Sequence, residues 1–194
     1  MTAHPIERFS EWLEEAKAVP GMTEPTAMTL ATVDGQGRPS ARIVLLKGHD
    51  ERGFVFYTNS ESRKGGELKG NPHVALCFYW MALERQVRIE GTVTPVLGAE
   101  ADAYFASRRR ESRIGAWASQ QSRPLESAEA LQRAVAEQTA RFEGQEVPRP
   151  AHWYGWRVAP ERIEFWQQGD FRIHDRQVYS RNASGGWDMQ LLYP

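Results

Sequence analysis

The chain has 194 residues, with 24 Lys and Arg against 25 Asp and Glu, so its formal net charge is −1. Hydrophobic residues make up 41% and charged residues 25%, which is typical of a soluble globular domain. Because the net charge is near zero, the surface as a whole is not built to attract nucleic acid or an anionic membrane, and any anion binding must come from local clusters of Lys and Arg. The single cysteine, Cys77, excludes an intrachain disulfide and a thiolate metal cluster. No stretch approaches the roughly 20 apolar residues of a membrane span, and the N-terminus carries no apolar signal region. We expect a cytoplasmic protein with no membrane or nucleic-acid partner.

The first half of the chain reads as one helix followed by strands. A helix is predicted over 5–18, because apolar residues recur there at helical spacing and a proline suits its first turn. Two β-rich runs, 28–33 and 40–46, flank an Asp-Gly turn at 34–35 and therefore predict a hairpin. The pattern then predicts a strand at 54–57, a short helix within 60–70, and strands at 73–80 and 86–96.

The second half begins with a helical insertion. From 98 to 142 the composition shifts to Ala, Glu, Gln and Arg, with apolar residues at helical spacing. Strands return at 153–158, 162–167, 171–179 and 187–191. About eight short strands joined by tight turns favour a mainly β, α+β fold with an antiparallel barrel, because parallel pairs would need crossover helices. No repeat or low-complexity tract divides the chain, so we expect one domain over 1–194.

Two constellations of polar residues could carry chemistry. If the segment around Arg108 is helical, Tyr104, Arg108 and Ser112 share one face and present a phenol, a guanidinium and a hydroxyl to one point. That combination suits a phosphate group. On such a helix Arg109 and Arg110 would point elsewhere into solvent. The alternative for any of these arginines is an ordinary solvated surface residue.

The second constellation lies near the C-terminus. A strand over 171–179 would place Arg172, His174 and Arg176 on one side, where they repel each other unless an anionic or aromatic group lies between them. Trp166 just before this face could flank a planar ligand. No two histidines stand at metal-ligand spacing, so no metal site is expected. P-loop, Gly-x-Gly-x-x-Gly and nucleophile-elbow motifs are also absent.

A series of short motifs runs in a fixed order from about residue 25 to the C-terminus. They are Arg-Ile-Val-Leu-Leu-Lys at 42–47, Tyr-Thr-Asn at 57–59 with Ser-Arg-Lys at 62–64, Leu-Glu-Arg-Gln-Val at 83–87, Ser-Arg-Ile-Gly-Ala-Trp at 112–117, Gln-Ser at 121–122, and Glu-Phe-Trp at 164–166 followed by Arg-Ile-His-Asp-Arg at 172–176. Together they resemble the pyridoxine/pyridoxamine 5'-phosphate oxidase family. The resemblance implies an FMN-binding antiparallel split β-barrel with flanking helices. It also implies a homodimer with two flavin sites at the subunit interface.

The resemblance further implies a reaction and a set of site residues. The reaction is oxidation of pyridoxamine 5'-phosphate and pyridoxine 5'-phosphate to pyridoxal 5'-phosphate, with O2 reduced to H2O2. FMN would be held by Arg42, Ile43, Val44, Leu45, Lys47, Tyr57, Thr58, Ser62, Arg63, Lys64, Gln86, Gln121, Ser122, Trp166 and Arg176. The substrate phosphate would be bound by Lys47, Tyr104, Arg108 and Ser112, which includes the set suggested by helical spacing. Arg172 and His174 would line the substrate ring, and we expect them to be the catalytic residues.

Two departures from the family pattern have expected consequences. Only a few residues precede the first predicted helix, so we expect the N-terminal segment that covers the substrate in relatives to be absent or replaced. The chain has Leu191 where the family commonly has an arginine. This difference puts any secondary binding role of that arginine in doubt.

Three other functions remain open at this point. One is an FMN-dependent oxidase of the same fold that acts on a different compound, such as a phenazine precursor. Another is a non-catalytic protein that binds flavin or pyridoxal phosphate. The third is a nucleic-acid binder that uses the arginines of 108–113, which the charge balance and the lack of interleaved exposed aromatic residues disfavour.

Overall fold

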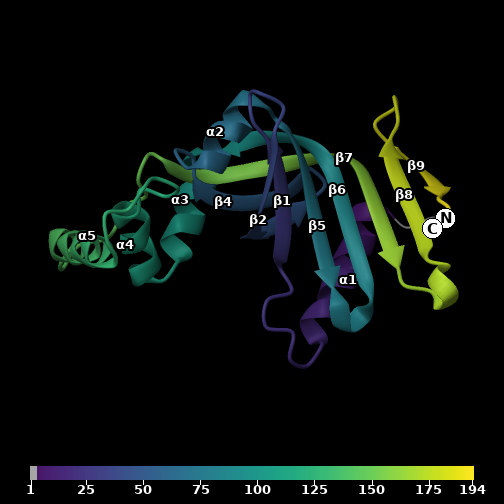
Figure 1. The fold of residues 1–194 in the computed structure, drawn as a ribbon, viewed down its shortest axis with the longest axis horizontal. Coiled ribbons are helices and arrows are strands. Elements are labelled where there is room, and N and C mark those ends of the chain that lie inside the picture. Colours follow the sequence, from purple (N-terminus) through teal and green to yellow (C-terminus); the bar gives the residue numbers. More distant parts are fainter. Residues whose placement is uncertain (1–3) are drawn as a thin grey trace.

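The computed structural model describes residues 4–194, and Figure 1 shows their fold. Residues 1–3, part of the stretch expected to carry no signal region, lie outside the described residues. The described residues form one antiparallel sheet of β1 (Ala27–Val33), β2 (Pro39–Leu45), β3 (Gly48–Asp50), β4 (Gly53–Asn59), β5 (His73–Trp80), β6 (Arg85–Val96), β7 (Trp153–Gln167), β8 (Asp175–Arg181) and β9 (Trp187–Leu191). The α-helices are α1 (Pro5–Ala18), α2 (Arg63–Gly70), α3 (Gly98–Ser107), α4 (Arg110–Ala118) and α5 (Ala128–Arg141). The mainly β, α+β fold class is as predicted.

The sheet curves into a barrel, because its two ends are joined by a very short connection. Seven strands follow the order β2-β1-β5-β6-β7-β4-β3, with β2 at one end and β3 at the other. Only Leu46 and Lys47 separate these two end strands along the chain. The Leu46 N–H donates to the Thr26 carbonyl at 2.9 Å, and the Lys47 N–H to the Val55 carbonyl at 2.8 Å. The end strands therefore meet at Lys47 without a regular ladder between β2 and β3.

Local sequence explains where the first elements begin and end. The β1–β2 hairpin turns at Asp34, whose Oδ1 accepts hydrogen bonds from the backbone N–H groups of Gln36 and Arg38, both at 2.9 Å. Gly37 supplies the positive φ of this turn, 78°. Helix α2 begins at Arg63, later than the start of the predicted segment, because the Ser62 hydroxyl accepts from the Gly65 N–H at 3.3 Å and caps the helix.

The two strands predicted at 153–158 and 162–167 are one long strand, β7, so the prediction of two strands was wrong. The β6–β7 register shifts between Glu90 and Gly91, which pair with Arg162 and Pro160. This bulge lets β7 carry a proline and still continue. Gly91 is required there, since a Cβ at that position would lie 2.1 Å from the Ala159 carbonyl oxygen. The prediction of about eight strands also missed β3, which has only three residues.

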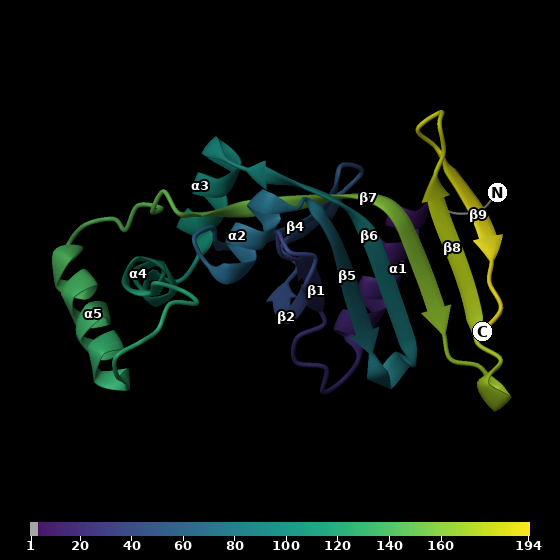
Figure 2. The ribbon, with the colours of Figure 1, turned by 45° about the horizontal axis from the view of Figure 1, so that its top comes forward.

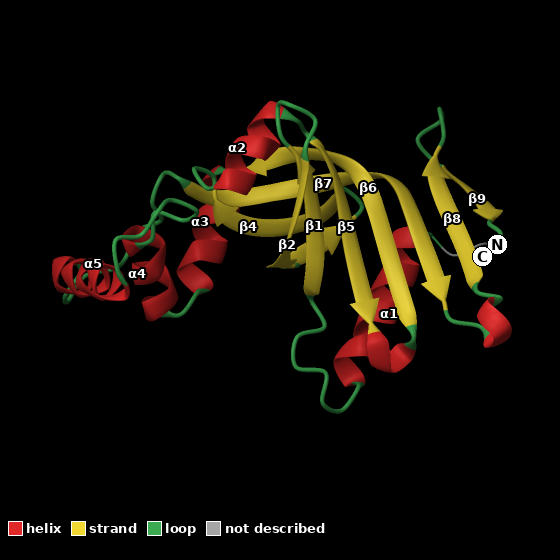
Figure 3. Ribbon diagram, viewed as in Figure 1, coloured by secondary structure: helices red, strands yellow, loops and turns green. Residues whose placement is uncertain are grey.

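Alternating apolar residues fill the barrel, and α1 lies along it (Figure 3). Along β5, Val74, Leu76, Phe78 and Trp80 are buried and the residues between them are more exposed. Phe9 of α1 is fully buried and meets the rings of Phe54 and Phe78 at 4.9 and 5.1 Å. A second apolar cluster joins the helical insertion to the start of β7 and consists of Phe105, Ile114, Phe142, Val147 and Trp153.

The helical insertion and the C-terminal hairpin extend from opposite ends of the barrel. Figures 1 and 2 show α3, α4 and α5 on one side and the β8–β9 hairpin on the other. The two views agree, so a site that uses both parts of the chain cannot form within one compact pocket of a single subunit.

Candidate active site

The main cavity of the described residues lies where β2, β4, α2 and the helical insertion meet, with a volume of about 730 Å³. Most of the residues predicted to hold cofactor or substrate phosphate line it. They are Arg42, Ile43, Val44, Leu45, Lys47, Tyr57, Thr58, Lys64, Tyr104, Arg108, Ser112 and Gln121. Six further lining residues were missed by the sequence analysis: Asn59, Arg109, Gly115, Ala116, Ser119 and Trp153. Asn59, Gly115 and Ala116 stand inside the motifs that carry the resemblance, and Arg109 directly follows Arg108, which was the available signal.

One side of the cavity carries a half-buried lysine among polar side chains. Lys64 Nζ donates to Gln121 Oε1 at 2.7 Å and lies 3.3 Å from Thr58 Oγ1. The Thr58 hydroxyl donates to the same Gln121 oxygen at 3.1 Å. Burial lowers the pKa of Lys64, and the nearby charge of Arg42 lowers it further. An anionic ligand beside Lys64 would stabilise its charged form and so offset the effects of burial and of Arg42 on its pKa.

The other side carries Tyr104, Arg108 and Ser112, but not on one helix, so the geometric basis of that prediction was wrong. Helix α3 ends at Ser107, Arg108 and Arg109 are extended, and α4 begins at Arg110. No proline or glycine marks the break. The three side chains still reach the same cavity, from the end of α3, the link and the first turn of α4.

The outcomes for the two neighbouring arginines also differ from expectation. Arg109 is exposed but lines the cavity, so it does not point elsewhere. Arg110 is partly buried and donates to the backbone carbonyls of Gln145 at 2.8 Å and Phe142 at 2.5 Å. Arg110 therefore ties α4 to the segment after α5 instead of being solvated.

Aromatic rings hold Arg108 at the cavity. Its guanidinium carbon lies 4.6 Å from the Trp153 ring centroid, and Tyr57 and Tyr104 stack with centroids 4.1 Å apart. Burial lowers the pKa of Arg108, and its buried Nη1 has no hydrogen-bond partner among residues 4–194. A buried guanidinium nitrogen without a partner is costly, so this geometry fits an anionic group supplied by a ligand.

The remaining residues of the first cofactor group lie around α2 and after α4. Ser62 is buried as the N-cap of α2, and Arg63 is largely exposed and pairs with Glu67 at 2.9 Å. Ser122 has a left-handed backbone, φ 73°, in the turn after α4. None of the three is among the residues that line the main cavity. They nevertheless adjoin Lys64 and Gln121, which do line it.

A second group of predicted residues forms a row across three strands. Gln86 of β6 pairs with Trp166 of β7, and Trp166 pairs with Arg176 of β8. Arg176 donates to Glu164 Oε1 at 2.8 Å and to the Tyr193 carbonyl at 3.0 Å. Because paired residues in adjacent strands stand side by side, this row presents one set of side chains on the sheet surface.

Arg172 and His174 do not belong to a strand, so the predicted alternation of Arg172, His174 and Arg176 on one strand face was wrong. Asp170–Arg172 is a 3₁₀ turn, and β8 begins only at Asp175. Phe171 and Arg172 have left-handed backbone angles, φ 54° and 66°. The turn is tight, since the Ile173 N–H donates to the Asp170 carbonyl at 2.9 Å.

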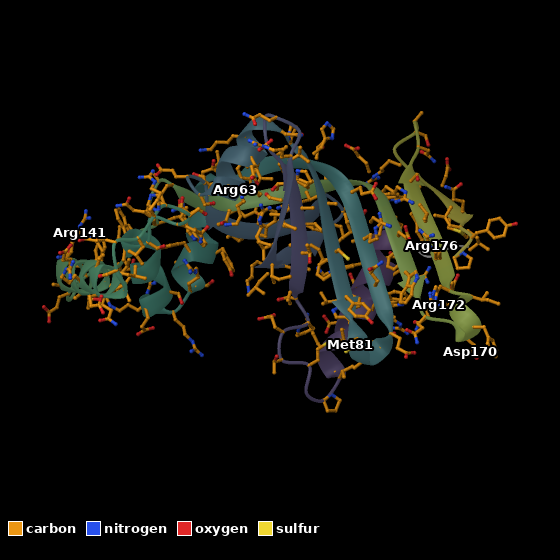
Figure 4. All side chains as sticks on the ribbon, in the orientation of Figure 1. Arg63, Met81, Arg141, Asp170, Arg172 and Arg176 are labelled. Carbon is orange, nitrogen blue, oxygen red and sulfur yellow. The ribbon has the colours of Figure 1, made fainter. Side chains whose placement is uncertain are left out.

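This turn and Trp166 line another cavity, of about 570 Å³. The rings of Trp166 and His174 lie 4.7 Å apart, and the Gly169 N–H donates to His174 Nδ1 at 3.3 Å. Figure 4 shows Arg172 and Arg176 at the end of the molecule that carries β8, while Arg63 lies near α2. The predicted residues thus fall into two separate groups in one chain.

Comparison with known proteins identifies the family. Residues 13–142 match the family described as Pyridoxamine 5'-phosphate oxidase, and residues 153–194 match the Pyridoxine 5'-phosphate oxidase C-terminal dimerisation region. This chain belongs to the pyridoxamine 5'-phosphate oxidase family. The second match covers β7, β8, β9 and the turn between β7 and β8, and therefore includes Trp166, Arg172 and Arg176.

Members of the pyridoxamine 5'-phosphate oxidase family resemble the chain over nearly its full length. The Pyridoxine/pyridoxamine 5'-phosphate oxidase of Sphingopyxis alaskensis is 57% identical, covering 100% of this chain and 89% of that protein. The protein of the same name from Rhodospirillum rubrum is 59% identical, covering 98% and 96%.

Solved structures agree with the fold. PhzG of Burkholderia lata, crystallised in complex with tetrahydrophenazine-1-carboxylic acid, is 34% identical with a TM-score of 0.92, covering 98% of this chain and 93% of that one. A pyridoxamine 5'-phosphate oxidase-related, FMN binding protein of Nostoc punctiforme is 17% identical with a TM-score of 0.78 over 100% of both chains, which shows the fold. No helix among residues 4–194 is long and apolar enough to cross a membrane.

Proposed function

We propose that this protein is an FMN-dependent oxidase that converts pyridoxamine 5'-phosphate and pyridoxine 5'-phosphate to pyridoxal 5'-phosphate, with reduction of O2 to H2O2. The observation that carries the proposal is the main cavity, which has cationic groups on two sides. Lys64 lies near Arg42, Arg108 lies against Trp153 on the side of the helical insertion, and Lys47 also lines the cavity. Two phosphate-bearing molecules, coenzyme and substrate, account for both.

The residues of the main cavity bind and orient. Arg42 to Leu45, Lys47, Tyr57, Thr58, Lys64 and Gln121 would hold FMN, together with Ser62, Arg63 and Ser122 next to them. Lys47, Tyr104, Arg108 and Ser112 would bind the substrate phosphate, which fixes the position of the pyridine ring. When bound, FMN supplies hydride acceptance from the substrate carbon and reoxidation by O2.

We propose that a second subunit completes this site. Gln86, Trp166 and Arg176 stand in one row, and Arg172 and His174 lie on the exposed turn, apart from the main cavity of their own chain. In a homodimer the partner subunit's row would contact FMN, and its turn would contact the substrate ring. The dimerisation-region match over 153–194 supports this arrangement, since it includes the turn.

In the assembled site Arg172 orients the substrate and assists removal of its proton, with His174 beside it. Arg172 carries a permanent positive charge, which favours negative charge developing near it. The left-handed backbone at Phe171 and Arg172 is a conformation that residues other than glycine rarely adopt. Such a conformation persists where the surrounding structure requires it, often at a functional site.

Oxygen uptake tests the proposal directly. The purified protein is expected to be yellow, and pyridoxamine 5'-phosphate and pyridoxine 5'-phosphate should each cause O2 consumption with H2O2 release. Unphosphorylated pyridoxamine serves as the control and should be oxidised far more slowly. A flavin-loaded protein that consumes no O2 with either phosphorylated vitamer would contradict the proposal and leave a binding protein or another oxidase.

A second candidate is an oxidase of phenazine precursors, favoured by the 34% identity to PhzG over most of both chains. Against it stand the higher identity to proteins named pyridoxine/pyridoxamine 5'-phosphate oxidase and the Tyr104, Arg108 and Ser112 set, which a substrate without phosphate does not need. A reduced phenazine carboxylate in the same oxygen-uptake assay separates the two.

A cytoplasmic location stays a prediction.

A further inference from the structure

A buried carboxylate lies behind the cationic side of the main cavity. Glu67 of α2 has a side chain that is only 5% exposed. Its Oε2 accepts hydrogen bonds from Thr32 Oγ1 at 2.5 Å, Ser40 Oγ at 2.8 Å and Arg42 Nη2 at 3.0 Å. Its Oε1 accepts from Arg63 Nε at 2.9 Å. Glu67 thus connects α2 with β1 and β2.

This carboxylate is ionised at neutral pH despite its burial. Burial alone raises the pKa of Glu67, but the hydrogen bonds from Thr32, Ser40 and Arg63 and the charge of Arg42 outweigh it and lower the pKa to about 2. A buried charge that is fully hydrogen-bonded holds its partners in one geometry, because any rearrangement would leave it unsatisfied.

The residue held most firmly by this arrangement is Arg42, which lines the main cavity. Besides Glu67, its guanidinium donates to the Leu30 carbonyl at 3.1 Å and to Thr32 Oγ1 at 2.6 Å. Its side chain is 20% exposed, whereas that of Arg63 is 65% exposed and is anchored by Glu67 at one point. Loss of the carboxylate would free Arg63 completely and remove the charged partner of Arg42.

The charge balance of this cluster matches a phosphate monoester. Arg42, Arg63 and Lys64 contribute three positive charges and Glu67 one negative charge, so the cluster has a surplus of two. A phosphate monoester carries close to two negative charges at neutral pH. Glu67 also offsets the effect of Arg42 on the pKa of Lys64, since the carboxylate raises that pKa and Arg42 lowers it.

We propose that Glu67 is a positioning residue that orients Arg42 and Arg63 toward the phosphate of FMN and so gives the protein its preference for FMN over uncharged riboflavin. Glu67 itself does not touch the flavin. This inference rests on the proposed function, because it assumes that FMN binds in the main cavity.

Flavin binding to the full-length protein freed of cofactor tests this role without measuring turnover. Flavin fluorescence is titrated with FMN and with riboflavin for the wild type and for Glu67→Ala. Because a hydrogen bond to a charged group contributes about 1.5–3 kcal/mol, we expect FMN affinity to fall about tenfold or more. Riboflavin affinity should change by less than about twofold, since riboflavin has no phosphate to be positioned.

The matched control is Leu68→Ala in the same helix. Leu68 is buried in the core, 2% exposed, so its truncation loosens the packing of α2 without removing a partner of Arg42. We expect lower thermal stability and an unchanged ratio of FMN to riboflavin affinity. Equal losses of both affinities in Glu67→Ala, or an unchanged FMN affinity, would overturn the positioning role.

A second variant covers the case in which Glu67→Ala does not fold. Glu67→Asp keeps the charge but withdraws the carboxylate by one methylene group, so a smaller loss of FMN preference is expected. A folded Asp variant with the wild-type ratio of affinities would overturn the proposal. If the wild-type protein itself binds neither flavin, or binds both equally, the cofactor assignment of the proposed function fails first.

Discussion

The main cavity and the C-terminal turn are built in contrasting ways. Around the cavity, Lys64 and Arg42 are partly buried and hydrogen-bonded within their own chain. In the turn, Phe171 is 95% exposed and Ile173 is 70% exposed, and the backbone takes left-handed angles. The cavity is therefore organised by one chain, whereas the turn is largely exposed in its own chain. The proposed homodimer, in which each cavity would receive the partner's turn, would account for both features.

The largest expected effect is that of Arg172→Ala, which changes the turn and leaves the cavity intact. If the turn serves the chemical step and the cavity serves binding, turnover should fall about 100-fold or more, a magnitude typical of losing one charge-stabilising group. FMN affinity should change little. Steady-state kinetics and flavin titration measure the two quantities. Arg181→Ala at the exposed end of β8 is the control, and near-normal turnover of Arg172→Ala would remove Arg172 from the mechanism.

A change in the cavity should have a different kinetic signature. In Arg108→Ala the phosphate partner is lost, so we expect KM for pyridoxamine 5'-phosphate to rise about tenfold to a hundredfold with a smaller change in kcat. Arg109→Ala, which removes an exposed neighbour on the same cavity, should raise KM less. An unchanged KM for Arg108→Ala in steady-state assays would contradict the phosphate site.

The same contrast explains what sequence could and could not predict. Most strands and α1 follow from local patterns, such as the Asp34 turn and the alternation along β5. Most cavity residues could be named because they stand in the short motifs that carry the resemblance. The resemblance also placed Gln86, Trp166 and Arg176 in the cofactor set; that these three adjoin one another was not predicted and is seen only in the strand register.

The failures lie where tertiary contacts override local preference. The break between α3 and α4 falls at Arg108 and Arg109, without a proline or glycine, and Arg108 there packs against Trp153, far along the chain. The left-handed backbone at Phe171 and Arg172 likewise has no local signal, because neither residue favours it. A strand was the natural prediction for this segment, and only contacts across the turn exclude it.

The smallest expected effect tests whether the turn geometry itself matters. A Cβ at Gly169 would lie 2.0 Å from the Ile173 carbonyl oxygen, so Gly169→Ala must shift the turn that carries Arg172 and His174. We expect kcat to fall severalfold to about tenfold, because small displacements of orienting groups reduce turnover. Gly66→Ala is the matched control, since its Cβ meets nothing within 4 Å and alanine favours the helix by up to about 1 kcal/mol. It should raise thermal stability slightly and leave kcat unchanged. Equal kcat values for the two variants would mean that Arg172 and His174 tolerate movement of their turn. The geometry of the turn would then not matter for turnover.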